Sequence, residues 1–195
     1  MTPPPEDKSN GYEQVAEQFM RRRNSRIGAA AVREWSKTLP RGAAVLDLGC
    51  GHGVPISQAL FEEGFAVHGI DASARMIAAF HERFPHAPAE CAAAEDSQFF
   101  GRTFDGVIAW GLLFLLPGDI QGAIIHKVAG ALRPGGRFLF TSPREAVTWI
   151  DTMTERESVS LGFQAYQELL LAAGLRLVRE QTDEGDNFYY LAGKQ

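Results

Sequence analysis

The sequence predicts an α/β protein built on a doubly wound sheet of seven mostly parallel strands, with helices on both faces. Two observations favour this fold class. Short apolar stretches alternate with helical patterns along most of the chain, which is typical of a parallel sheet covered by helices. Near the C-terminal end, two strand patterns are separated only by the connector "EGD", so we expect an antiparallel hairpin to close the sheet.

The expected helices begin in residues 12–39, where apolar residues recur at mixed three- and four-residue spacings. This segment is predicted to form one broken helix or two short helices, and "PRG" at 40–42 ends it. Two of the later helical patterns stop at a glycine, which is the usual residue just past a helix end. The later helices are expected at 54–64, 72–84, 118–132 and 162–174.

The expected strands are largely apolar, as is usual for strands that are buried on both faces. The first is a continuous apolar pattern that Asp47 alone interrupts. The seven strands are expected at 44–49, 66–71, 89–93, 104–111, 137–142, 175–183 and 187–193. The residues after the fifth strand, which include Trp149, are predicted to be a looser stretch.

Length and composition indicate one domain of 12–195 behind a flexible, proline-rich lead of 1–11. A net charge of −5 gives no basic surface for nucleic acid. The lead lacks the apolar core of a signal peptide, and no apolar run approaches the roughly 20 residues of a membrane span, so we expect a soluble cytoplasmic protein. Cys50 and Cys91 are the only cysteines, and neither a disulfide nor a metal site is expected.

The segment "VLDLGCGHG" at 45–53 is the clearest candidate for a binding loop. Glycines at alternate positions let the chain turn sharply after the strand and let a ligand approach the backbone. Asp71 follows 22 residues after Gly49, at the predicted end of the second strand. A carboxylate there can accept hydrogen bonds from a ribose diol. The two features together indicate a cofactor that carries a nucleoside.

Two cofactor classes share this arrangement. Dinucleotide enzymes use G-x-G-x-x-G to bind a pyrophosphate, whereas this chain has G-x-G-x-G with Asp47 two residues before the first glycine. A carboxylate so close would repel a pyrophosphate and would suit a cationic group such as an ammonium or a sulfonium. His52, inside the loop, is placed where it could face the cofactor, but taken alone it is expected to be a bystander that points outward.

Four segments, "VLDLGCGHG", "GIDAS", "FDGVIAWG" and "LRPGGRFLF", resemble in order and spacing the class I S-adenosylmethionine-dependent methyltransferases of the small, single-domain type. The resemblance is close over roughly 41–142 and looser in the C-terminal part. It implies a Rossmann-like fold with a helical cap or lid at 12–39, a cofactor-binding core at 41–142 and a substrate side at 143–195. The implied cofactor is S-adenosylmethionine, with S-adenosylhomocysteine as product.

The resemblance also implies roles for individual residues. The loop under the methionine and ribose would contain Gly49, Cys50, Gly51 and Gly53, while Asp47 would orient the methionine ammonium directly or through water. Asp71 would bind the ribose, with Ala72 beside the adenine. Ala93 stands where relatives carry an acidic residue, so Glu95 or Asp96 takes over the adenine contact, or the backbone suffices. The remaining implied contacts, at the methionine end, are Trp110, Tyr12 and Arg23.

The acceptor is expected to be small and partly apolar, because the candidate pocket residues Phe114, Trp149 and Tyr166 are aromatic. Methyl transfer would be a direct in-line displacement that depends mainly on proximity and alignment. No general base is recognisable. The alternatives are a nicotinamide-dependent oxidoreductase and a non-catalytic protein that binds S-adenosylmethionine. The chain is expected to be a monomer or a homodimer.

Overall fold

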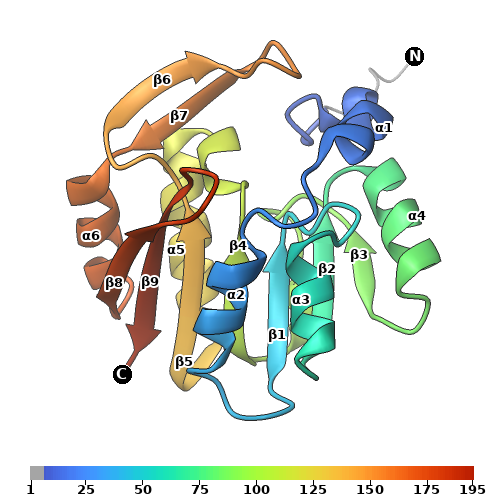
Figure 1. The fold of residues 1–195 in the computed structure, drawn as a ribbon. Helices are drawn as coiled ribbons and strands as arrows, with labels where there is room; N and C mark the ends of the chain where they lie inside the picture. Colours follow the sequence, from blue (N-terminus) through green and yellow to red (C-terminus); the bar gives the residue numbers. More distant parts are fainter. Residues whose placement is uncertain (1–6) are drawn as a thin grey trace.

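The computed structural model describes residues 7–195, so the first six residues of the predicted lead lie outside the described part. A seven-stranded sheet occupies the centre of the molecule, in the order β3-β2-β1-β4-β5-β9-β8 (Figure 1). Its first five members pair in parallel, and β9 pairs antiparallel with both β5 and β8. The predicted fold class is therefore confirmed. The strands are β1 (Ala44–Leu48), β2 (Ala66–Asp71), β3 (Ala89–Cys91), β4 (Phe104–Ala109), β5 (Leu132–Thr141), β8 (Leu175–Thr182) and β9 (Phe188–Lys194).

Helices cover both faces of this sheet (Figure 1). The segment 12–39 forms two short helices rather than one broken helix. In residues 7–195, no helix has the length and apolar character needed to cross a bilayer. The helices are α1 (Tyr12–Arg22), α2 (Ala29–Ser36), α3 (Ile56–Glu62), α4 (Ala74–Arg83), α5 (Gly118–Ala131) and α6 (Phe163–Ala172), with short 3-10 turns η1 (Phe99–Gly101) and η2 (Leu113–Leu115).

The central strand β1 separates two apolar cores. Successive strand residues point to opposite faces of a sheet. Accordingly, Val45 packs with α2 and α3, whereas Leu46 and Leu48 pack in the core that contains residues of α5 and α6. All five β1 residues are buried. Burial on both faces explains the continuous apolar pattern of β1. It also fixes the carboxyl end of this strand, where the glycine loop begins.

A second, two-stranded sheet was not predicted from the sequence. The strands β6 (Ala146–Ile150) and β7 (Glu157–Leu161) form an antiparallel hairpin in the region expected to be a looser stretch. It projects beyond the main sheet, on the same side as α1 (Figure 1). Four of the five β6 residues are exposed, so the segment lacks the apolar alternation that identifies a strand against a core.

Residues 7–11 form a turn that contacts this hairpin. The Asp7 carboxylate accepts a hydrogen bond from the Arg156 guanidinium over 2.8 Å, and the Asn10 side chain donates to the carbonyl of Glu157 over 3.4 Å. Ser9 is buried and begins the first turn of α1 by accepting a hydrogen bond from the backbone N–H of Glu13. The described end of the predicted lead therefore connects α1 to the β6–β7 hairpin.

Candidate functional site

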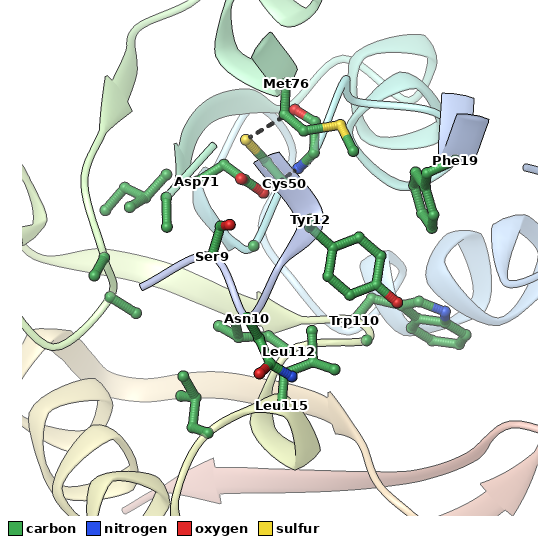
Figure 2. A pocket seen from close by; sticks show the side chains of 18 of the residues that line it. Ser9, Asn10, Tyr12, Phe19, Cys50, Asp71, Met76, Trp110, Leu112 and Leu115 are labelled. Carbon is green, nitrogen blue, oxygen red and sulfur yellow. Dashed lines mark hydrogen bonds between the residues drawn. The ribbon is translucent and has the colours of Figure 1, made fainter. Parts of the chain in front are cut away.

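A cavity lies at the carboxyl ends of the parallel strands, where α/β sheets of this kind bind their ligands. Its walls come from the segments that follow β1, β2, β3 and β4, and residues 8–10 and α1 cover it (Figures 1 and 2). The space between these walls is about 1170 Å³, counting the open mouth. The sequence-predicted residues that line this cavity are Tyr12, Arg23, Gly49, Cys50, Gly51, Asp71, Ala72, Glu95, Trp110 and Phe114.

The glycine loop turns directly beneath this cavity. Gly51 has a φ of +54°, and a Cβ there would find only the Met76 sulfur, at 3.9 Å, so its side of the loop is open. Gly53 does not line the cavity. Its φ is +82°, and a Cβ would lie 2.5 Å from the ring of Phe84. Gly51 thus leaves room for a ligand, whereas Gly53 lets the loop pack against the aromatic rings of α4.

The carboxylate of Asp71 holds the loop in place. Its Oδ2 accepts a hydrogen bond from the backbone N–H of Gly51 over 2.8 Å, and its Oδ1 accepts one from Ser73 over 2.8 Å. Burial raises the pKa of this carboxyl, and the two backbone N–H groups oppose that shift. Each carboxylate oxygen keeps a further lone pair for a ligand. Asp71 therefore combines a structural contact with an acceptor at the cavity wall.

Asp47, which was expected to orient a ligand ammonium directly or through water, does not line the cavity, so only the contact through water stays open. It is 1% exposed, and its Oδ2 accepts a hydrogen bond from the Ser57 hydroxyl over 2.6 Å. Burial raises the pKa of Asp47 to about 7, the Ser57 hydrogen bond lowers it, and the charge of Asp71 raises it further. A buried carboxyl of this kind would be stabilised in its charged form by a nearby cation.

For His52 the sequence analysis favoured an outward-pointing bystander over a residue that faces the cofactor, and the structure places it at the cavity. Its side chain is buried, lines the cavity and packs edge-on against Phe19 at 6.3 Å between ring centroids. Burial lowers the pKa of His52 to about 4, and the charges of Arg83 and Arg23 lower it further. The imidazole is therefore neutral at pH 7. Its place between two loop glycines was the only signal available in the sequence.

Helix α1 supplies Tyr12 and Phe19 to the covering layer of the cavity, and Arg23, the residue after its last turn, also lines the cavity. The Tyr12 hydroxyl donates a hydrogen bond to Asp151 of the hairpin connector over 3.2 Å. The Arg23 guanidinium lies 5.9 Å from the centre of the Phe19 ring, and burial lowers its pKa. Within residues 7–195, no carboxylate forms an ion pair with Arg23 inside 4.0 Å. This cation is available to an anionic ligand group.

The carboxylates of Glu95 and Asp96 occupy different environments. Glu95 lines the cavity, with its Oε1 at 3.5 Å from the Lys8 ammonium, and its Oε2 is buried without a hydrogen-bond partner among the described residues. Asp96 is exposed, binds Lys8 over 2.6 Å and does not line the cavity. Of the two residues considered for the adenine contact, Glu95 is the one that has an unused acceptor.

The aromatic candidates for an acceptor pocket are not all at the cavity. Phe114 lines it, and Trp149 packs behind Phe114 at 5.4 Å between ring centroids. Tyr166 is 0% exposed and lies in the core, where its hydroxyl contacts Gln121 at 2.6 Å and Ser142 at 2.8 Å. The core position of Tyr166 is a correction to the sequence-based expectation, because the inner face of α6 packs on the sheet rather than on the cavity.

No group of three or more metal-ligating side chains occurs within residues 7–195. As far as residues 7–195 show, the cavity presents a glycine loop, a strand-end carboxylate, an acceptor on Glu95 without a partner, a cation without an ion pair and an aromatic wall. These groups match the parts of a nucleoside linked to a charged amino acid.

Comparisons with known proteins bear on the family and the fold of this chain. Residues 45–136 match the profile of a family described as "Methyltransferase domain". No curated protein sequence matches the chain. Many solved structures share the fold, and because the identities below are under 25%, they bear on the fold alone.

Three of these structures illustrate the likeness. The CcbJ methyltransferase from Streptomyces caelestis has a TM-score of 0.80 at 15% identity, over 97% of this chain and 100% of that one. The 1,6-didemethyltoxoflavin-N1-methyltransferase from Burkholderia thailandensis, with bound 1,6-didemethyltoxoflavin and S-adenosylhomocysteine, has a TM-score of 0.75 at 21% identity over 94% and 84%. A SAM-bound amino pentose methyltransferase from Micromonospora echinaspora has a TM-score of 0.73 at 18% identity over 93% and 96%.

Proposed function

We propose that the chain, whose residues 45–136 match a methyltransferase domain, is a class I S-adenosylmethionine-dependent methyltransferase. It would transfer a methyl group from S-adenosylmethionine to a small-molecule acceptor by direct in-line displacement. The observation that carries the proposal is the single cavity in which a glycine loop, Asp71 and an aromatic wall meet. The cofactor supplies a methyl group on a positively charged sulfur, which a nucleophile can displace.

The nucleoside half of the cofactor fits the cavity wall formed by β2 and the segment after β3. The free lone pairs of the Asp71 carboxylate suit the two ribose hydroxyls. Ala72 and Met76 offer apolar surface beside them. The buried, unpartnered Oε2 of Glu95 suits the exocyclic amino group of adenine, because a carboxylate can only accept hydrogen bonds.

The amino-acid half fits the wall formed by the glycine loop and α1. Arg23, which has no carboxylate within 4.0 Å among residues 7–195, suits the carboxylate of the methionine part. The imidazole of His52, which is neutral at pH 7, lies on the same wall of the cavity. Asp47 lies behind the loop, so its effect on the methionine ammonium would act through water or through space.

The acceptor would occupy the remaining part of the cavity, towards Phe114 and the hairpin. Trp110, Leu112, Phe114 and Leu115 line that part and are apolar or aromatic. They exclude water and favour a small molecule with an apolar ring or face. Tyr12 is the polar group above them, and its hydroxyl already donates to Asp151.

The side chains around the cavity provide alignment rather than proton transfer. Neutral His52, with a pKa of about 4, is a weak base at pH 7. Burial is the main reason that the pKa of the Tyr12 hydroxyl is raised, and the nearby Asp151 carboxylate raises it further. The hydroxyl therefore stays protonated at pH 7. We therefore propose that the acceptor atom arrives with a free lone pair. The N1-methyltransferase among the similar structures makes nitrogen acceptors the first class to test.

A turnover experiment tests this proposal. The protein would be incubated with S-adenosylmethionine and a panel of small aromatic and sugar-derived amines, and S-adenosylhomocysteine and methylated products would be followed by mass spectrometry. Production of both, in equal amounts, supports the proposal. Binding of the cofactor without turnover on any acceptor would favour the non-catalytic alternative, and binding of NADH instead would favour the oxidoreductase alternative.

A further inference from the structure

The turn that carries Glu95 is supported from behind by helix α5. Residues 92–98 connect β3 to η1 without forming a helix or strand. Ala93, Ala94 and Glu95 line the cavity from this turn. A segment of this kind holds a side chain in place only if its own backbone is fixed, because each free backbone dihedral adds conformational entropy.

Lys127 of α5 provides that support. Its ammonium donates hydrogen bonds to the carbonyls of Ala94 and Glu95, each over 3.0 Å, and to the carbonyl of Ser97. A lysine has three N–H donors, so all of them are used on this turn. The same nitrogen lies 4.6 Å from the centre of the Phe99 ring. Lys127 thus fixes both the turn and the residue that follows it.

The charge of Lys127 is not neutralised by an ion pair. Within residues 7–195, no carboxylate lies inside 4.0 Å of its nitrogen. Burial lowers its pKa, and the charges of Asp96, Glu95 and Glu90 oppose that shift. A cation held against three backbone carbonyls stabilises the turn through charge-assisted hydrogen bonds.

Glu95 lines the cavity from the same turn and carries an unused acceptor. Oε1 of Glu95 lies 3.5 Å from the Lys8 ammonium, and Oε2 is buried without a hydrogen-bond partner among residues 7–195. Buried polar atoms in folded proteins are nearly always paired, so an orphan acceptor on a side chain that lines the cavity suits a donor on the ligand. The placement of that oxygen depends on the backbone carbonyls that Lys127 binds.

We propose that Lys127 is a positioning residue for nucleobase recognition, which holds the 94–97 turn so that Glu95 accepts a hydrogen bond from a 6-amino purine. The inference rests on the proposed function and adds a specificity to it. A 6-oxo purine presents an acceptor at the same position, and a carboxylate facing it is left unpaired. A site of this kind rejects the analogue strongly.

The test compares S-adenosylhomocysteine with S-inosylhomocysteine in calorimetric titrations. The variants are Lys127→Met, which removes the donors, and Lys127→Arg, which keeps them. Lys194→Met is the matched control, because Lys194 also caps two backbone carbonyls, those of Ala129 and Leu132 at 2.6 and 2.7 Å, but lies outside the cavity. Melting temperatures of all variants monitor folding.

We expect the wild-type protein to prefer the adenine compound by about tenfold or more, the equivalent of one to two hydrogen bonds. Lys127→Met should lose most of that preference, Lys127→Arg should retain it, and Lys194→Met should retain it even if its melting temperature falls. An unchanged preference in Lys127→Met, or an equal loss in Lys194→Met, would overturn the inference.

Two further outcomes separate this inference from the proposed function. If Lys127→Met fails to fold, Glu95→Gln replaces it, and an unchanged preference in that variant also overturns the inference, since the carboxylate would then play no part. Failure of the wild-type protein to bind S-adenosylhomocysteine would overturn the proposed function itself. Normal binding with equal affinity for the inosine compound would overturn only the nucleobase specificity.

Discussion

The Oδ2 atom of Asp47 accepts a hydrogen bond from the Ser57 hydroxyl over 2.6 Å, at a point where solvent reaches only 1% of Asp47 and none of Ser57. The hydroxyl compensates only part of the cost of burying the carboxylate, so the pKa of Asp47 rises to about 7. The free protein therefore keeps a destabilising carboxyl directly behind its glycine loop. Such a cost is expected where a charge serves a ligand rather than the fold.

Replacing Asp47 by Asn tests this interpretation. Between about pH 4 and pH 7 the native protein holds a proton that the unfolded chain has lost, so the free energy of unfolding falls as pH rises. Asp47→Asn removes this dependence and should stabilise the free protein by about 2–4 kcal/mol at pH 8. Urea denaturation at pH 5 and pH 8 measures the effect. Equal stability of both proteins at pH 8 would contradict the account.

The same variant should bind S-adenosylhomocysteine more weakly. A ligand ammonium near Asp47 favours the charged carboxylate, so binding near pH 7 should release part of a proton from the wild-type protein and less from Asp47→Asn. Calorimetry in buffers with different ionisation enthalpies measures that proton. Identical proton release by the two proteins would exclude Asp47 as the group that senses the ammonium.

His52 should give the opposite pH dependence. Its pKa of about 4 lies below its ordinary value, so below pH 6.5 the unfolded chain binds a proton that the native protein does not. The free energy of unfolding should fall as pH drops from 6.5 to 4, and His52→Gln should reduce that slope. Denaturation curves across this interval provide the check, and an unchanged slope would show that the imidazole is not held neutral.

The sequence predicted the main sheet because its strands are buried on both faces and its turns contain glycines. The sequence also predicted that Asp71 and the glycine loop share one site, because the carboxyl ends of neighbouring parallel strands lie at the same end of the sheet. It did not reveal that Tyr166 faces the core, since an aromatic residue on an amphipathic helix suits either location. The β6–β7 hairpin was missed because β6 is mostly exposed and shows no buried apolar face. Only its backbone pairing with β7 makes it a strand, and the sequence pattern does not show that pairing.

Tyr166 supports the fold and the hairpin base rather than the acceptor. Its hydroxyl contacts Gln121, Ser142 and the backbone N–H of Leu161. Tyr166→Phe should therefore lower the free energy of unfolding by about 1–3 kcal/mol, because buried partners lose their hydrogen bonds. Its affinity for S-adenosylhomocysteine should not change. Chemical denaturation and calorimetry measure the two effects.

Tyr190→Phe is the matched control for that variant. Tyr190 is equally buried, but within residues 7–195 its hydroxyl makes one long hydrogen bond, to the carbonyl of Pro143 at 3.4 Å. The loss of stability should be clearly smaller than for Tyr166→Phe. A weakened affinity for S-adenosylhomocysteine in Tyr166→Phe alone would mean that Tyr166 acts on the cavity after all.

Asp71→Asn should weaken binding of S-adenosylhomocysteine by about 1–3 kcal/mol, because it removes a charged acceptor from the ribose hydroxyls. Asp105→Asn is the control. Asp105 also accepts a backbone N–H, that of Ala44 at 2.9 Å, and pairs with Arg133, but it lies outside the cavity. Equal effects of the two variants on affinity would show that Asp71 acts only through the stability of its loop.

The most direct test of the central claim is a calorimetric titration of the purified protein with S-adenosylhomocysteine, with NADH titrated in parallel. The account predicts micromolar binding of S-adenosylhomocysteine and no heat from NADH. Binding of NADH without binding of S-adenosylhomocysteine would contradict it, because the glycine loop and Asp71 would then hold a dinucleotide.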